Sequence, residues 1–204
     1  MAIEKLELIG GHPCLDFVNT AGDHLAEQPG EWLHTYPDLL TWSVRANLLT
    51  DEERSAALVL AGKQPRQAAE ALARAIAARE SIYHLLLSII RGQQPQPGDL
   101  AEFNLALKQA PERSRISFES GEYHWRPPDQ GAEPDLDLVL WQALWSAADL
   151  LTSRRSLARV KLCEGDQCGW LFLDSSRNHS RRWCSMSDCG NRAKANRYYQ
   201  RHKG

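Results

Sequence analysis

The spacing of apolar residues predicts a mainly helical N-terminal part of the chain. Residues 35–49 place leucine and valine near helical spacing, and residues 65–92 form a longer stretch of the same kind. Pro65 suits a first helical turn and Gly92 suits a helix end. Residues 135–153 carry apolar side chains so densely that we expect a deeply buried helix there.

Shorter signals place boundaries between these elements. Thr50 and Glu53 form a capping-box pattern that begins a helix over residues 50–62. The proline-rich residues 93–98 break the chain, and Asp99 is expected to restart a helix.

A period of two replaces the helical period in residues 114–126. "SRISFES" and "EYHWR" alternate around Gly121, which predicts a small antiparallel hairpin, and residues 126–134 read as a loop. The predicted fold class is α+β, a mainly helical N-terminal domain with a small antiparallel sheet, plus a small C-terminal domain. We place the boundary so that the domains cover residues 1–155 and 156–204.

Composition narrows the class of protein. Apolar residues make up 43% of the chain and charged residues 25%, which suits a packed core. No apolar run approaches the roughly 20 residues of a membrane-spanning helix, and the N-terminus lacks a signal-peptide pattern. We therefore expect a cytoplasmic protein without a membrane partner, in which thiols stay reduced.

The net charge of −2 conceals a strong asymmetry. Residues 1–150 contain 22 acidic and 12 basic residues, a net of −10, whereas residues 151–204 contain 4 and 12, a net of +8. The two values add up to the −2 of the whole chain. An acidic body followed by a basic tail favours a polyanionic partner for the tail.

Four of the five cysteines form two matched pairs near the C-terminus. Cys163 and Cys168 enclose four residues, as do Cys184 and Cys189. Zn²⁺ takes four thiolates in a tetrahedron, and a domain of about forty residues needs such a staple to fold. The spacing therefore predicts one Zn²⁺ per chain. Because all four ligands would be protein atoms, no position is left for a reactive water, and the ion is expected to be structural.

Alternatives to a four-cysteine zinc site stay open at this point. Two disulfides would satisfy the pairing, but they are rare where thiols stay reduced. An iron–sulfur cluster also takes four cysteines, although the paired gaps and the basic surroundings fit zinc better. His179 could replace one ligand. With four cysteines present, we expect it instead to be a surface residue or to contact a phosphate group of a bound partner.

Basic residues surround the second cysteine pair. Nothing after Gly190 breaks a helix, so this pair is expected to anchor the start of a basic helix. Arginine and lysine bind phosphate, and helix side chains can reach base edges in the major groove. The two cysteine pairs, with a hairpin between them and a helix after the second pair, predict a treble-clef or zinc-ribbon-like finger. The residues expected to contact nucleic acid are Arg177, Arg181, Arg182, Asn191, Arg192, Lys194, Arg197 and Arg201.

Two motifs resemble known families. "CGNR" at residues 189–192, after "CGWLFLD" and "SRRWCSM", closely resembles the CGNR zinc finger. "GGHPCLDFVNT" at residues 10–20 and "WSAADLLTS" resemble the ABATE domain that precedes this finger. The resemblance implies a bacterial stress-induced transcription regulator, with a ligand-sensing or interaction domain ahead of a DNA-binding finger. It also implies that the four cysteines are zinc ligands and that Arg192 lies on the DNA-contacting helix.

The segment at residues 10–20 gathers polar side chains in the acidic body. They are expected either to hydrogen-bond the backbone at a chain turn or to line a ligand pocket. Cys14 lies close in sequence to His12 and Asp16, residue types that can activate a cysteine nucleophile. A small buried hydrophobic residue is the simpler interpretation of Cys14. The residues assigned to a pocket are Asp16, Asn19, Thr20 and, from the long helix, Arg79 or His84.

Three hypotheses of function follow. The first, which we favour, is a DNA-binding transcription regulator that is not an enzyme and whose body senses a small-molecule effector or mediates assembly. A single finger binds weakly, so we expect a homodimer with two half-sites. The second is an RNA-binding or protein-interaction zinc module. The third is an enzyme built on Cys14 or Asp16.

Overall fold

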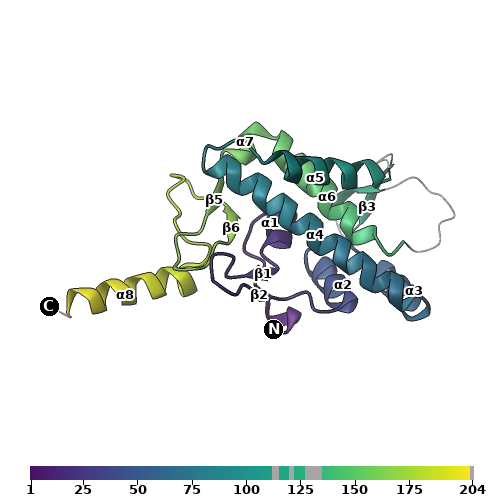
Figure 1. Cartoon of the computed structure of the whole chain (residues 1–204), viewed down its shortest axis with the longest axis horizontal. Helices are drawn as coiled ribbons and strands as arrows, with labels where there is room; N and C mark the ends of the chain where they lie inside the picture. The colour runs from purple at the N-terminus through teal and green to yellow at the C-terminus, as the bar shows by residue number, and fades with distance from the viewer. Residues whose placement is uncertain (112–114, 120–121, 127–134, 203–204) are drawn as a thin grey trace.

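The computed structural model describes residues 1–111, 115–119, 122–126 and 135–202. In this part of the chain, helices dominate and the strands form small antiparallel pairs (Figure 1). The helices are α1 (Pro13–Val18), α2 (Tyr36–Arg45), α3 (Asp51–Lys63), α4 (Pro65–Ile90), α5 (Pro97–Gln109), α6 (Leu138–Thr152), α7 (Arg154–Leu157) and α8 (Asn191–Arg201), with short turns of helix at Ile3–Lys5 and Met186–Gly190. The strand pairs are β1 (Ala21–Gly22) with β2 (Gly30–Glu31), β3 (Arg115–Glu119) with β4 (Glu122–Arg126), and β5 (Val160–Leu162) with β6 (Leu171–Leu173).

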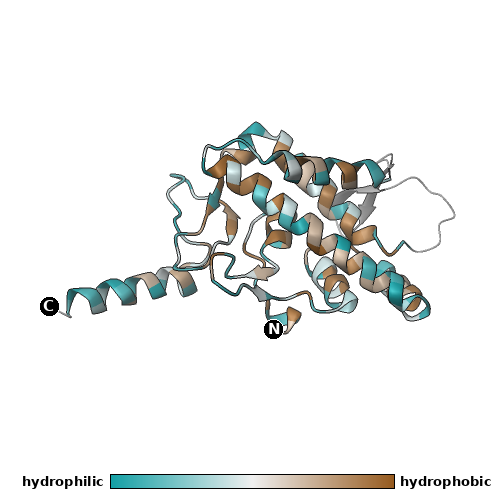
Figure 2. Ribbon diagram, viewed as in Figure 1, coloured by the Kyte–Doolittle hydropathy of each residue, from teal (hydrophilic) through white to brown (hydrophobic). Residues whose placement is uncertain are grey.

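The main core is built around α6. Val139, Leu144, Ala147 and Leu150 of this helix have no exposed surface, and α6 packs against α1, α4 and α5. Figure 2 shows apolar residues gathered on the packed helices, whereas α8 is largely hydrophilic. Of the described helices, none is both long and apolar enough to cross a membrane.

Several predicted boundaries are confirmed. The Thr50 hydroxyl accepts a hydrogen bond from the Glu53 amide at 3.1 Å, and the Glu53 carboxylate accepts one from the Thr50 amide at 2.8 Å, which completes the capping box. α4 begins at Pro65, and Gly92 follows its end with a φ of +65°. This left-handed conformation is one that glycine adopts without steric cost.

Other elements differ from the expectation in detail. A short helix, α1, replaces the chain turn expected around Asp16, because His12 caps it and Pro13 suits its first turn. α5 begins at Pro97 rather than at Asp99. A second capping box, between Thr35 and Asp38, begins α2 and was not predicted.

The predicted hairpin is present as β3 and β4, whose register pairs Arg115 with Arg126 and Glu119 with Glu122. Its expected turn at Gly121 and most of the expected loop, residues 127–134, lie outside the described residues.

The C-terminal part is joined to the helical body by a buried seam. Val160 and Leu171 of β5 and β6 belong to the main core. The Asn19 side chain, 1% exposed, accepts a hydrogen bond from the Leu171 amide at 2.9 Å and donates one to the Leu171 carbonyl at 2.8 Å. It thus pairs with β6 as a neighbouring strand would. The Trp170 indole donates to the Ala21 carbonyl at 2.9 Å and adds a second link.

Asn19→Ala is expected to lower the free energy of unfolding by about 2–6 kcal/mol. The change leaves a buried N–H and a buried C=O of Leu171 without partners, and each such group costs about 1–3 kcal/mol. Urea unfolding followed by circular dichroism measures the loss. Asn196→Ala, on exposed α8, is the matched control and should shift stability by no more than about 0.5 kcal/mol. Equal stabilities of the two variants would contradict the role given to Asn19.

Candidate metal centre and basic helix

The first cysteine pair lies in the turn of the β5–β6 hairpin. The Cys163 amide donates to the Trp170 carbonyl at 2.8 Å, which closes the turn next to the strands. A β-carbon on Gly165 would lie 2.8 Å from the Cys189 sulfur, so a larger residue would collide with the second cysteine pair there. The hairpin turn therefore brings the sulfurs of Cys163 and Cys168 within 4.8 Å of each other, and Gly165 leaves room beside them for the sulfur of Cys189.

The second cysteine pair lies at the start of α8. Cys184 follows the chain that returns from β6, and Cys189 lies in the helical turn Met186–Gly190, which runs directly into α8. The Ser185 hydroxyl accepts a hydrogen bond from the Asp188 amide at 3.4 Å and so caps this turn. A metal at the pair would thus be tied to the beginning of the helix.

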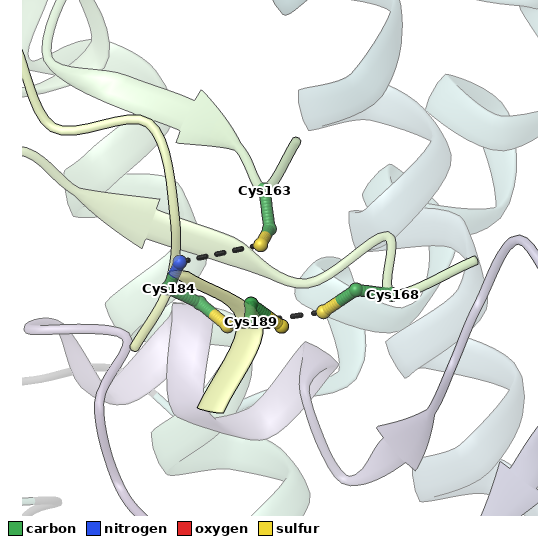
Figure 3. Close-up of side chains that lie close together, drawn as sticks. All are labelled: Cys163, Cys168, Cys184 and Cys189. Atoms are coloured by element: carbon green, nitrogen blue, oxygen red, sulfur yellow. Dashed lines mark hydrogen bonds between the residues drawn. The ribbon is translucent and has the colours of Figure 1, made fainter. Parts of the chain in front are cut away.

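The four sulfurs converge, as Figure 3 shows. They lie within 4.8 Å of one another, with 3.8 Å from Cys168 to Cys184 and 3.7 Å from Cys184 to Cys189. Zn–S bonds of about 2.3 Å at tetrahedral angles put sulfurs about 3.8 Å apart. Disulfides need about 2.05 Å, and all four cysteines are free. The cluster fits a tetrahedral metal ion.

Hydrogen bonds favour a thiolate at Cys163, whereas the hydrogen bonds that Cys168 and Cys184 make with Cys163 raise their own pKa values. Each of the four residues is at most 4% exposed. The amides of Gly165 and Cys184 each donate to the Cys163 sulfur at 3.3 Å. Hydrogen bonds from the Cys168 and Cys184 thiols and from these amides lower the pKa of Cys163, although burial opposes the shift. A deprotonated sulfur is the form that binds a metal.

A buried carboxylate organises the chain between the two pairs. Asp174, with no exposed surface, accepts hydrogen bonds from Lys161 Nζ at 2.6 Å, from the Ser176 hydroxyl at 2.6 Å and from the Arg181 amide at 3.0 Å. Burial disfavours its charge, but these donors hold the pKa of Asp174 below its usual range. This residue was not predicted, although an aspartate directly after an apolar strand was a visible signal in the sequence.

α8 projects away from the rest of the chain (Figure 1). Its residues from Asn191 to Arg201 are exposed or half-buried, and none is buried. Tyr198 and Tyr199 expose 61% and 67% of their surface. The side chains of this helix are thus largely accessible to solvent.

Comparison with known families gives two matches. Residues 11–154 match the ABATE family model, described as "Putative stress-induced transcription regulator". Residues 159–202 match the CGNR zinc finger. The chain belongs to the ABATE family. None of the curated proteins compared with it matches. The expected order of an ABATE domain followed by a CGNR finger is thereby confirmed.

Within the CGNR finger, the predicted nucleic-acid contacts divide into two groups. Arg177, Lys194, Arg197 and Arg201 have no side-chain partner among the described residues, apart from the bond of Arg197 to the carbonyl of Ala193 in its own helix. The other four side chains bind within the finger.

Two of these arginines stabilise the chain between the cysteine pairs. Arg181 stacks over the Phe172 ring at 4.4 Å and donates to the carbonyls of Trp183 and Cys184. Arg182 pairs with Glu164, with a distance of 2.7 Å between Nε and the carboxylate. Arg181 is thus part of the internal structure of the finger, whereas the exposed Arg182 pair can exchange Glu164 for another anion.

The remaining two side chains bind at the start of α8. Asn191 donates to the Ser187 carbonyl at 3.0 Å. Arg192 contacts Asp188 and the Cys189 sulfur. Side-chain hydrogen bonding within one helical turn cannot be read from composition, which is why all eight residues looked equivalent in the sequence.

Within the ABATE region, the residues assigned to a ligand pocket bind other protein groups. Asp16 accepts from the Gly10 amide at 2.8 Å, and burial raises the pKa of Asp16 to about 6. Arg79, 3% exposed, donates to the Thr20 hydroxyl at 3.1 Å and to both carboxylate oxygens of Glu31 at 2.8 Å. His84 instead lies at the surface beside Asp99. A ligand role for these residues stays a prediction.

Cys184→Ser is expected to abolish metal binding by the CGNR finger. A serine hydroxyl is a poor ligand for Zn²⁺, and the loss of one of four ligands removes the link between the hairpin turn and α8. Elemental analysis should show zinc in the wild-type protein and almost none in the variant. Limited proteolysis should cut the variant after residue 184, while the far-ultraviolet spectrum keeps the helices of the ABATE region.

Cys14→Ala is the matched control, since Cys14 is buried in the main core rather than in the cysteine cluster. It should keep its zinc. A Cys184→Ser variant that keeps both its metal and its protease resistance would overturn the assignment.

Proposed function

We propose that this ABATE protein is a zinc-dependent DNA-binding transcription regulator. Cys163, Cys168, Cys184 and Cys189 hold one structural Zn²⁺ per chain, and α8 contacts DNA. The observation that carries the proposal is the position of the buried thiol cluster at the start of an exposed basic helix. A metal there fixes the direction in which the helix leaves the body.

The chemistry of the cysteine cluster supports a structural metal. Four protein sulfurs complete a tetrahedral shell, so no position is left for a reactive water. When bound, the ion supplies folding energy and a fixed geometry. The cytoplasm, where thiols stay reduced, is the location that fits this proposal.

The arrangement of charge on α8 supports DNA as the partner. Lys194, Arg197 and Arg201 are spaced three and four residues apart, which places them along one face of the helix. All three are exposed. Arginine and lysine side chains neutralise phosphates of a nucleic-acid backbone and give sequence-independent affinity. Residues 1–150 carry a net charge of −10 and repel phosphates, so the attraction to a nucleic acid is confined to the finger.

The ABATE region has the role of sensing or assembly in this proposal. A small-molecule effector and a homodimer both remain predictions, the second because one short basic helix gives few phosphate contacts. The division into residues 1–155 and 156–204 separates these roles, although the two parts share the seam at Leu171.

The affinity for random duplex DNA is expected to fall steeply as salt rises, since each phosphate contact adds about −0.9 to the slope of log K against log salt. Lys194→Ala should make this slope shallower by about one. Fluorescence anisotropy over a salt series measures both. Lys63→Ala, an exposed lysine at the end of α3, is the control and should leave the slope unchanged. A zinc-loaded protein that shows no salt-dependent affinity would contradict DNA binding.

A second candidate, RNA binding, is favoured by one observation. Tyr198 and Tyr199 are highly exposed, and exposed aromatic rings stack on unpaired bases. If duplex DNA is the partner, a single-stranded RNA of equal length should displace labelled duplex only at much higher concentration. Displacement at lower concentration, lost in Tyr199→Ala, would establish RNA as the partner instead. A zinc-loaded protein that binds neither nucleic acid would favour a protein-interaction module.

A further inference from the structure

Arg192 differs from the other cations of α8 in what it contacts. Its guanidinium donates to the Cys189 sulfur at 3.2 Å and lies 3.1 Å and 3.3 Å from the two carboxylate oxygens of Asp188. Two anchors thus hold one side chain, although 54% of that side chain is exposed. Of the eight residues predicted to contact nucleic acid, Arg192 is the one that reaches a sulfur of the cluster.

The helix geometry separates Arg192 from the basic row. Successive residues of an α-helix turn by about 100° around its axis. Lys194, Arg197 and Arg201 therefore lie about 140–180° from Arg192, on the opposite side of α8. If that row faces a nucleic acid, Arg192 faces back toward the cysteines and the body.

A buried tetrathiolate site needs a cation beside it. Four thiolates and one Zn²⁺ carry a net charge of −2, and burying that charge is costly unless neighbouring donors offset it. A guanidinium at a ligand sulfur supplies both positive charge and a hydrogen bond, and such outer partners orient metal ligands. Lys194, Arg197 and Arg201 make no comparable contact with a sulfur in the described part of the chain.

Arg192 also lines a cavity beside the site. This cavity, of about 330 Å³, is lined as well by three of the four cysteines, Cys168, Cys184 and Cys189. Asp23 and Trp170 line the same cavity. The Arg192 side chain thus contacts the buried sulfur of Cys189 while 54% of the side chain is exposed, so we expect its removal to make that sulfur more accessible to water.

We infer that Arg192 is a positioning residue of the metal site, which orients and charge-compensates Cys189, and not a residue that contacts nucleic acid. The inference rests on the proposed function only in taking Zn²⁺ as the occupant of the cysteine cluster. It assigns the contact with nucleic acid to the opposite face of α8.

The test compares zinc affinities of the full chain by competition with a chelator. Arg192→Gln, which keeps a hydrogen-bond donor but neither the charge nor the full length, should bind zinc about 10–100-fold more weakly than the wild type. Arg192→Lys, which restores the positive charge, should recover much of that loss, whereas the uncharged Arg192→Met, of similar bulk to lysine, should not. Lys194→Ala is the matched control and should match the wild type. Cobalt substitution adds a second readout, since the thiolate absorption bands should change in Arg192→Gln and not in Lys194→Ala.

The DNA assay with zinc-saturated protein completes the test. Arg192→Gln should keep the wild-type salt slope, whereas Lys194→Ala should lose about one unit of it. A zinc affinity within about twofold of the wild type, or a salt slope reduced as in Lys194→Ala, would overturn the inference. Should Arg192→Gln fail to fold, Asp188→Ala keeps the arginine but removes its second anchor, and a zinc affinity equal to the wild type would then count against the role.

The outcomes also separate this inference from the proposed function. A wild-type protein that binds zinc but no nucleic acid removes the DNA-binding proposal, while the zinc affinities still decide the role of Arg192. A wild-type protein that binds no zinc removes both.

Discussion

The convergence of four cysteine sulfurs holds the C-terminal part of the chain in its shape. The second apolar cluster of the structure consists of these cysteines and Phe172, with Ile9, Trp170 and Trp183 at its edge. So small a cluster cannot offset the conformational entropy of the chain that surrounds it. Four thiolates within 4.8 Å would also repel one another without a cation. We therefore propose that an ion bound by the four sulfurs holds the second cysteine pair and the start of α8 against the first pair.

The two cysteine pairs are supported very differently. The first pair lies on the body, because the amides of His24 and Leu25 donate to the carbonyls of Cys168 and Gln167 at 2.9 Å and 3.2 Å. Tyr83 of α4 adds a hydrogen bond to the Gly169 carbonyl at 3.0 Å. The second pair leads into a helix that has no packing partner in the described chain. The cluster thus lies between a pair of cysteines hydrogen-bonded to the body and a helix without a packing partner in the described chain.

The sequence predicted those features that depend on neighbouring residues. The capping box at Thr50, the end of α4 at Gly92 and the matched cysteine spacing are all local patterns, and the structure contains each of them. The seam was not predictable in this way. Asn19 bonds to Leu171, which is 152 residues distant along the chain, and no local pattern distinguishes it from an asparagine that caps a turn. Asp174 was missed for a related reason, since its partners come from both sides of the hairpin.

The contact of Arg192 with Cys189 was neither an obvious local pattern nor a long-range contact, because the distance of three residues between them already indicated it. A residue three positions after Cys189 in a helix lies on the same face as that cysteine. "CGNR" therefore places its arginine beside the sulfur as soon as the helix begins at the second cysteine pair, whereas Lys194 and Arg197 fall on other faces. Counting all basic residues of α8 as one surface overlooked this periodicity. In our proposal, Arg192 on one face of the helix stabilises the metal site, whereas Lys194, Arg197 and Arg201 on the opposite face are left for an anionic partner.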